Sequence, residues 1–135
     1  MDEKGRAIIR VLNDLTYVSI DDFLSRLKLQ KLAYLAREMG CDCGFAFDWY
    51  VRGPYSPSLT RTLFSADELG ELRMERVELS DSEKAVVRDV RDLMGDDIDD
   101  VRALELTASV WYFLPRCQLS SEELSEIVDK LLECK

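Results

Sequence analysis

Few side chains in this sequence could carry out catalysis, because the chain of 135 residues contains no histidine. A serine–histidine or cysteine–histidine nucleophile pair is therefore excluded, and so is a zinc helix with the H-E-x-x-H motif. The G-x-x-x-x-G-K-[ST] and G-x-G-x-x-G loops of the common nucleotide-binding proteins are also absent. The residue types thus favour a binding protein over an enzyme, and they point to no cofactor.

Two of the four cysteines, Cys41 and Cys43, are separated by a single residue. In a cytosolic protein we expect free thiols rather than disulfides. The pair could offer two thiolates to a metal ion, but cysteine ligands of zinc are usually two to four residues apart. We therefore expect a polar turn with two thiols, with a zinc site as the less favoured alternative.

The densest group of carboxylates is the stretch D-D-I-D-D, from Asp96 to Asp100. A divalent cation is one possible ligand, but the stretch lacks the central glycine and the distal glutamate of an EF-hand loop. Acidic residues also gather ahead of helices, where they interact favourably with the helix dipole. The second interpretation is the one we favour. A hydrolase with two carboxylates is a further alternative, but no pair stands out.

Charge is unevenly distributed along the chain, whose formal net charge is -9. Residues 1–18 have no net charge, residues 19–63 carry +1 and residues 64–135 carry -10. Only the N-terminal half is therefore suited to contact phosphate groups. No apolar run reaches the roughly 20 residues that span a bilayer, and the N-terminus lacks the layout of a signal peptide. We expect one cytoplasmic domain over residues 1–135, without membrane contact.

Apolar residues at helical spacing predict helices over residues 2–15, 20–27, 26–40, 57–69, 81–94, 99–114 and 120–132. The expected N-caps are Ser19, Ser56, Ser80 and Ser120, the last two in capping boxes with Glu83 and Glu123. Pro115 is expected to end the helix over residues 99–114. Strands are predicted over residues 45–52 and 73–79. The fold class is mainly α (α+β), a helical domain with a small antiparallel sheet and a winged-helix-like N-terminal half.

The helix over residues 26–40 has an apolar arc and an opposite, mainly basic arc. The basic arc contains Arg26, Gln30, Lys31, Tyr34 and Arg37, and we expect it to be exposed. On DNA, Arg26, Lys31 and Arg37 would contact phosphates and Gln30 would reach a base edge. The structural alternative is an ordinary solvated helix face.

The strand over residues 45–52 leads into a corner formed by Arg52, Gly53, Pro54, Tyr55 and Ser56. A corner stiffened by prolines has a structural role of its own. It also presents backbone N–H groups and a tyrosine at a helix N-terminus, which suits an anion or a peptide carboxylate. The residues expected on the buried face of the preceding strand are Phe45, Phe47, Trp49 and Val51.

The stretch R-L-K-L-Q-K-L-A-Y-L-A, followed by an aromatic strand and Y-V-R-G-P-Y-S-P-S-L, resembles the K-L-Q-K-L-x-Y-L … Y-G-P-Y-S-x-x-L pattern of uncharacterised prokaryotic proteins of the YwgA-like family. It is similar, more distantly, to the Panacea domain of SocA-like antitoxins. The match covers residues 26–63. The resemblance implies a helix-rich fold with a small sheet, no established catalytic residues, and binding of a toxin partner or an adaptor role. The matched residues are Lys28, Leu29, Gln30, Lys31, Leu32, Gly53, Pro54 and Tyr55.

The predicted function is therefore a non-enzymatic binding module that engages a protein partner in an antitoxin-like or adaptor-like role. The alternative is a winged-helix-like transcriptional regulator that binds DNA. No catalytic or metal-binding residue is predicted. The candidate partner-binding residues are Arg26, Gln30, Lys31, Tyr34, Arg37, Arg52, Gly53, Pro54, Tyr55 and Ser56.

Overall fold

Six helices and one two-stranded sheet make up the part of the chain that the computed structural model describes, residues 2–117 and 121–133. The helices are α1 (Glu3–Leu15), α2 (Phe23–Glu38), α3 (Pro57–Glu68), α4 (Asp81–Met94), α5 (Val101–Cys117) and α6 (Ser121–Glu133), with a 3-10 turn, η1 (Gly95–Asp97), after α4. The strands are β1 (Asp48–Tyr50) and β2 (Gly53–Tyr55), and they pair antiparallel. The predicted mainly α fold with a small antiparallel sheet is confirmed.

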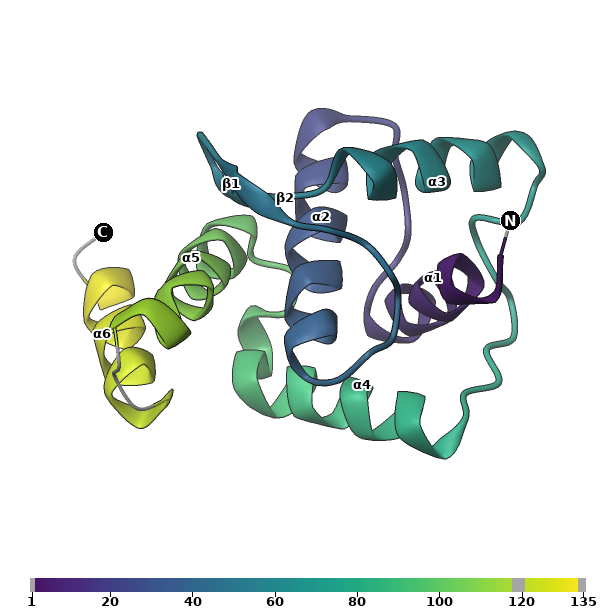
Figure 1. Ribbon diagram of the computed structural model, residues 1–135. Helices are drawn as coiled ribbons and strands as arrows, with labels where there is room; N and C mark the ends of the chain where they lie inside the picture. Colours follow the sequence, from purple (N-terminus) through teal and green to yellow (C-terminus); the bar gives the residue numbers. More distant parts are fainter. Residues whose placement is uncertain (1, 118–120, 134–135) are drawn as a thin grey trace.

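Helix α2 lies at the centre of the fold, with α1, α3 and α4 packed on one side and α5 and the β1–β2 hairpin on the other (Figure 1). Every residue from Leu29 to Ala36 is buried. A helix that has neighbours on all sides has no room for a solvated polar face. The expectation of an exposed basic arc is therefore wrong for the middle of this helix.

The N-terminus of α2 is set by Asp22, whose carboxylate accepts a hydrogen bond from the Ser25 N–H at 2.7 Å. The predicted cap, Ser19, instead accepts a hydrogen bond from the Asp21 N–H. Aspartate caps helices as well as serine does, so the cap nearer to the apolar run takes the role. The short helix predicted over residues 20–27 therefore begins only at Phe23, and it continues without a break as the first part of α2.

Helices α1 and α4 are joined through the buried carboxylate of Glu83. The predicted capping box is confirmed: the Ser80 N–H donates to Glu83 at 2.9 Å, and the Glu83 N–H donates to the Ser80 hydroxyl at 3.2 Å. Arg10 of α1 donates to both oxygens of the same carboxylate, at 3.3 and 2.9 Å. Glu83, in the first turn of α4, thereby also fixes the position of α4 against α1.

The segment between α3 and α4 forms no strand, so the strand predicted over residues 73–79 is wrong. The backbone of this segment forms hydrogen bonds with a side chain of α1. The Asn13 amide donates to the Leu72 carbonyl at 2.9 Å and accepts from the Met74 N–H at 2.9 Å. One asparagine thus supplies the donor and the acceptor that a neighbouring strand would have supplied.

The hairpin is shorter than the strand predicted over residues 45–52. Trp49 pairs with Pro54, which lacks an N–H, and a proline is tolerated in a ribbon of two edge strands. Of the expected buried face, Phe47 is buried, whereas Trp49 and Val51 are exposed because the hairpin extends beyond the core. Trp49 still packs against Phe113 of α5, with ring centroids 4.8 Å apart.

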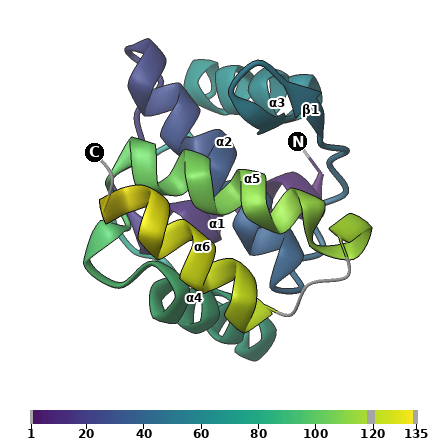
Figure 2. The same ribbon diagram turned by 90° about the vertical axis from the view of Figure 1, so that its left-hand side faces the viewer.

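Helices α5 and α6 pack against each other across the face of the molecule shown in Figure 2. Helix α5 continues past Pro115 to Cys117, so the prediction that the proline ends it is wrong. The missing donor falls in the last turn, where it removes a single backbone hydrogen bond. Asp100 begins the helix by accepting from the Ala103 N–H at 3.1 Å. The expected cap Ser120 lies outside the described residues.

A connected cluster of buried apolar side chains runs through α1, α2, α3, α4 and α5. Its fully buried members include Ile8, Leu12, Leu32, Leu59 and Leu104. Within the described residues, no helix combines the length and the apolar character needed to cross a membrane.

The Glu83 contacts predict a specific acid sensitivity. Burial alone would raise the pKa of the Glu83 carboxyl, but the hydrogen bonds from Arg10 and the Ser80 N–H outweigh burial and lower it. A carboxyl with a lowered pKa stabilises the fold at neutral pH and loses this contribution as the pH falls through its folded-state pKa. Urea unfolding of the Glu83→Gln variant should show a lower free energy of unfolding at pH 7, by about 1–3 kcal/mol, and a weaker decline below about pH 4.5.

Glu38→Gln, a change at an exposed end of α2, is the matched control and should follow the wild-type pH profile. Parallel profiles for Glu83→Gln and the wild type would contradict the role given to this carboxylate.

Candidate functional site

Two adjacent buried side chains of α2 hold the corner that follows the hairpin. The Gln30 amide donates to the Ser56 carbonyl at 2.9 Å and accepts from the Ser56 N–H at 2.9 Å. The Lys31 ammonium donates to the Pro54 carbonyl at 2.7 Å. Because an amide carries a donor and an acceptor, one glutamine satisfies both backbone groups of the residue opposite. We refer to these contacts of Gln30 and Lys31 as the corner clamp.

The residue types of the corner follow from this packing. Gly53 has φ +93, and a Cβ there would lie 2.8 Å from the Ser109 hydroxyl and 3.4 Å from the Lys31 ammonium, so a side chain has no room. Ser56 caps α3 by accepting from the Leu59 N–H, with a proline at the first helical position, as predicted. The Ser56 N–H already has Gln30 as its partner. The corner is therefore not free to bind an anion through this group.

Lys31 is fully buried, so its predicted contact with DNA phosphates is wrong. Burial lowers the pKa of its ammonium to about 8, while the nearby Glu105 carboxylate acts in the opposite direction and Arg52 adds to the lowering. The charge is retained near neutral pH because a carbonyl and a carboxylate face it. Gln30 is buried as well and cannot reach a base edge.

The remaining predicted residues of α2 differ in exposure. Tyr34 is buried and packs edge-on against Phe47, with ring centroids 5.4 Å apart. Arg37 is exposed, and its guanidinium lies over the Phe47 ring, 5.8 Å from the ring centroid. Arg26 is half-buried and donates to the Ile20 carbonyl at 2.9 Å. The predicted surface is therefore divided, since part of it is core.

A small pocket opens between the N-terminal half of α2 and α3, with a volume of about 90 Å³. Its apolar lining consists of Ile20, Phe23, Leu27, Leu63 and Phe64. Its polar lining consists of Arg26, Gln30, Tyr55 and Thr60. Three predicted site residues from two distant stretches, Arg26, Gln30 and Tyr55, thus meet in one place, which we call the α2–α3 pocket.

Three of the four polar residues of the α2–α3 pocket are hydrogen bonded to each other, and the fourth, Arg26, donates to the Ile20 carbonyl. The Tyr55 hydroxyl lies 2.6 Å from the Thr60 hydroxyl, to which the Gln30 amide also donates at 2.8 Å. The pocket therefore offers an apolar surface to a ligand. Two large aromatic side chains stand at its edge, Phe23 at 53% and Phe64 at 44% exposure.

Phe23 and Phe64 are not among the site residues that the sequence predicts. The pattern of apolar residues gives no signal for Phe64, because adjacent apolar residues of a helix can both be buried, as Ile8 and Ile9 are. Leu63 is buried and Phe64 is not.

Arg52 extends the basic edge of the pocket. Its guanidinium lies 5.5 Å from the Phe23 ring centroid and 3.2 Å from the Glu105 carboxylate of α5. Arg61 is exposed on α3, one residue from the pocket lining. Two arginines thus lie at the pocket, Arg26 in its lining and Arg52 over the Phe23 ring at its edge.

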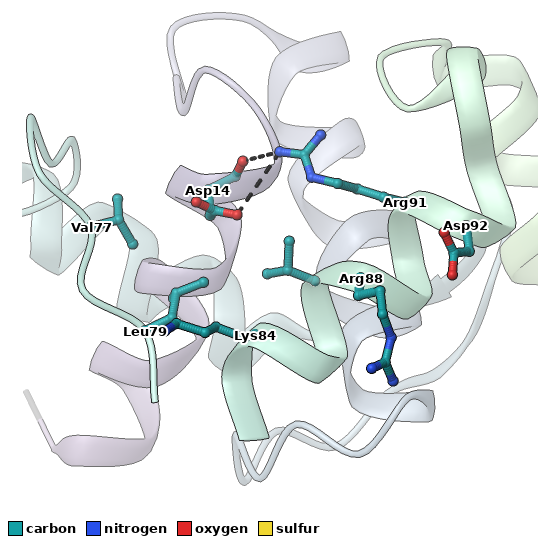
Figure 3. Close-up of a pocket in the computed structure, with 8 residues that line it drawn as sticks. Asp14, Val77, Leu79, Lys84, Arg88, Arg91 and Asp92 are labelled. Atoms are coloured by element: carbon teal, nitrogen blue, oxygen red, sulfur yellow. Dashed lines mark hydrogen bonds and ion pairs between the residues drawn. The ribbon is translucent and has the colours of Figure 1, made fainter. Parts of the chain in front are cut away.

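A larger, open groove of about 440 Å³ runs along α4. Figure 3 shows Arg91 reaching back to Asp14 of α1, where it donates to the backbone carbonyl and lies 3.9 Å from the carboxylate. Lys84, Arg88 and Asp92 line the rest of the groove. Acidic and basic residues alternate along it, so it has no strong preference for a charged ligand.

The acidic stretch has the structural role that its sequence favours. Asp99 accepts from Thr16 and from Lys28, at 3.3 Å for the latter, and these contacts, led by the Thr16 hydroxyl, lower the pKa of its carboxyl. Asp100 caps α5. Among the described residues, no group of three or more cysteine, aspartate or glutamate side chains is arranged to hold a metal ion.

Replacing Gln30 tests the corner clamp. In Gln30→Leu, the buried N–H and carbonyl of Ser56 lose their partner, and each unsatisfied buried group costs about 1–3 kcal/mol. We expect thermal and urea unfolding to show a loss on the order of 3 kcal/mol. Glu38→Gln on the same helix should change the free energy of unfolding by less than about 0.5 kcal/mol. Equal stabilities for Gln30→Leu and the wild type would contradict the clamp.

The lowered pKa of Lys31 predicts that the fold becomes more stable as the pH rises above neutral. Between pH 8 and 10.5 the unfolded chain keeps the proton that the folded chain has released, so raising the pH through this range stabilises the fold, by up to about 3 kcal/mol. Lys31→Met lacks this group. The difference in free energy of unfolding, wild type minus Lys31→Met, should therefore rise with pH over this range. A constant difference would exclude the lowered pKa.

Comparisons of the chain with protein-family models, with curated proteins and with solved structures found no match. The likeness to the YwgA-like family and to the Panacea domain therefore rests on the sequence motifs themselves. The geometry of the α2–α3 pocket is the basis on which a function can be argued.

Proposed function

We propose that this protein is a non-enzymatic binding module that takes a segment of a protein partner into the α2–α3 pocket. The observation that carries the proposal is a pocket with an apolar lining, internally paired polar groups and two exposed aromatic side chains, Phe23 and Phe64, at its edge. Exposed aromatic residues around a small pocket are typical of the anchor positions of protein interfaces.

The size of the pocket indicates which residue of the partner would enter. A cavity of about 150 Å³ holds a benzene molecule. At about 90 Å³, the α2–α3 pocket suits a branched aliphatic side chain better than an aromatic one. Phe23 and Phe64 would then pack around the anchor and exclude water from it.

Charge indicates what would flank the anchor. Arg26 lines the pocket, and Arg52 lies over the Phe23 ring at its edge. A partner segment with aspartate or glutamate next to its aliphatic residue would be complementary to these side chains. The partner class proposed is therefore an acidic peptide segment with an aliphatic anchor.

The corner clamp supports the proposal because it fixes Tyr55 and the start of α3 against α2. Two walls of the pocket are thus held by buried hydrogen bonds before any partner arrives. Binding to such a preorganised site avoids the entropic cost of ordering it. The toxin-binding or adaptor role implied by the Panacea resemblance is one form that this engagement could take.

The alternative of a DNA-binding regulator has less support. Two of its four predicted contacts, Gln30 and Lys31, are buried in the centre of the fold. With a net charge of -9, the protein would also need a strongly basic face elsewhere. Random-sequence duplex DNA at low salt should show no measurable binding, and affinity that falls steeply with salt would favour this alternative.

Selection from a random peptide library displayed on phage tests the proposal. Against the wild-type protein we expect enrichment of peptides with a leucine, isoleucine or valine flanked by acidic residues. Phe64→Asp should weaken binding of the enriched peptides by about tenfold or more, because a charge at the pocket edge removes apolar contact and repels the acidic flanks. Isothermal titration with the synthetic peptides measures the change.

The matched control is Leu69→Asp. Leu69 is 62% exposed, follows α3 and lies outside the pocket lining, so the same substitution there should leave the affinity unchanged. Peptides that bind both variants equally, or a selection that enriches no sequence pattern, would refute the pocket as the binding site.

A further inference from the structure

We propose that Cys41 and Cys43 are a peroxide-reactive dithiol that closes reversibly into a disulfide within the loop joining α2 to β1. The proposal is independent of the α2–α3 pocket. It concerns a chemical modification site for a small hydroperoxide, and it rests on how the loop holds the two sulfur atoms.

The backbone brings the two cysteines close enough to be bridged. Residues two apart in an extended chain have Cα atoms about 7 Å apart, which is the upper limit for a disulfide. Here the Cys43 N–H donates to the Cys41 carbonyl at 3.0 Å, so the loop makes a tight turn at this point. Such a turn shortens the Cα separation into the range that a disulfide spans.

The two thiols have different environments, and these favour the thiolate form of one of them. The pKa of Cys43 is lowered, because its thiolate accepts a hydrogen bond from the Cys41 thiol and is also favoured by the Phe45 N–H and by Arg37. The pKa of Cys41 is raised, first by that same contact and then by burial, with Glu83 and Asp42 adding to the effect. A thiolate therefore faces a thiol.

The remaining charge near the turn belongs to Lys4 of α1, which pairs with Asp42 at 3.4 Å. Its side chain also lies 3.0 Å from the position that a Cβ of Gly44 would take. The turn is thus held against α1 from one side and against the end of α2 from the other. Both cysteine side chains are buried beneath this packing.

The reaction needs a hydroperoxide as the oxidant. The Cys43 thiolate attacks the peroxide oxygen, the O–O bond breaks, and the alkoxide or hydroxide that leaves takes up a proton. The product is Cys43 sulfenic acid. The Cys41 sulfur then attacks the Cys43 sulfur, its proton leaves with the hydroxyl as water, and the disulfide forms. In total, two thiols and one hydroperoxide give one disulfide, one alcohol or water molecule, and one further water molecule.

Burial decides which oxidants can react. Cys41 is 8% and Cys43 is 2% exposed, so a bulky disulfide reagent reaches neither sulfur easily. Asp42 and Gly44 on either side are exposed, and the loop around them belongs to no helix or strand. Hydrogen peroxide is hardly larger than water and is the probe that fits this access.

The experiment treats the reduced full-length wild-type protein with hydrogen peroxide, blocks remaining thiols and maps tryptic peptides. Cleavage after Arg37 and Arg52 leaves both cysteines in one peptide, residues 38–52, apart from Cys117 and Cys134. We expect this peptide to lose the mass of two hydrogen atoms and to regain it with dithiothreitol. Oxidation of Met39 adds an oxygen instead and is distinguished by mass.

Single variants assign the roles. Cys41→Ser should stop at the sulfenic acid, which dimedone traps, and Cys43→Ser should react at least about tenfold more slowly than the wild type. If both cysteines of this peptide are found blocked after peroxide treatment, neither thiol was oxidised, and the proposal is overturned whatever the variants do. Equal rates for the two variants would overturn the assignment of Cys43 as the attacking sulfur.

Discussion

The buried contact between α2 and the corner is the constraint on which the shape of this protein depends. A ribbon of two strands is barely stable by itself, and each strand here has three residues. Gln30 and Lys31 bind backbone groups at the end of the ribbon and hold it on α2, while Trp49 and Arg52 contact α5. Ser56 is also the N-cap of α3. The same contacts therefore set the direction of α3, and with it the width of the α2–α3 pocket.

The corner clamp also changes what the family-like motifs mean. The two motifs are separated along the sequence, but Gln30 and Lys31 of the first contact Pro54 and Ser56 of the second. Glycine is required between them because Lys31 and Ser109 occupy the space of a side chain. The motifs are therefore two parts of one structural unit. Their joint presence in a sequence indicates this local fold first, and the residues that would select a partner lie beside them, at Phe23 and Phe64.

Local signals were sufficient for much of the fold. The Ser56 cap with its proline and the Ser80–Glu83 box were predicted because each involves residues within one turn of a helix. The burial of Lys31 could not be predicted from such local signals. Its burial depends on a carbonyl 23 residues away, and an isolated helical pattern cannot contain that information. The wrong prediction of a strand over residues 73–79 has a similar cause. The backbone at the start of this segment pairs with the side chain of Asn13, which is distant in the sequence.

The uneven charge of the chain acquires a spatial meaning in this fold. Most of the acid excess falls on residues 95–100 and on α6, each with a net charge of -4, and α6 lies on the other side of α2 from α3 (Figure 1). The molecule therefore has an electric dipole, with its more negative pole away from the arginine-lined opening. This dipole steers an approaching acidic ligand toward the less negative pole, where the opening lies. Encounter rates should consequently fall as ionic strength rises, even where the bound contacts are mainly apolar.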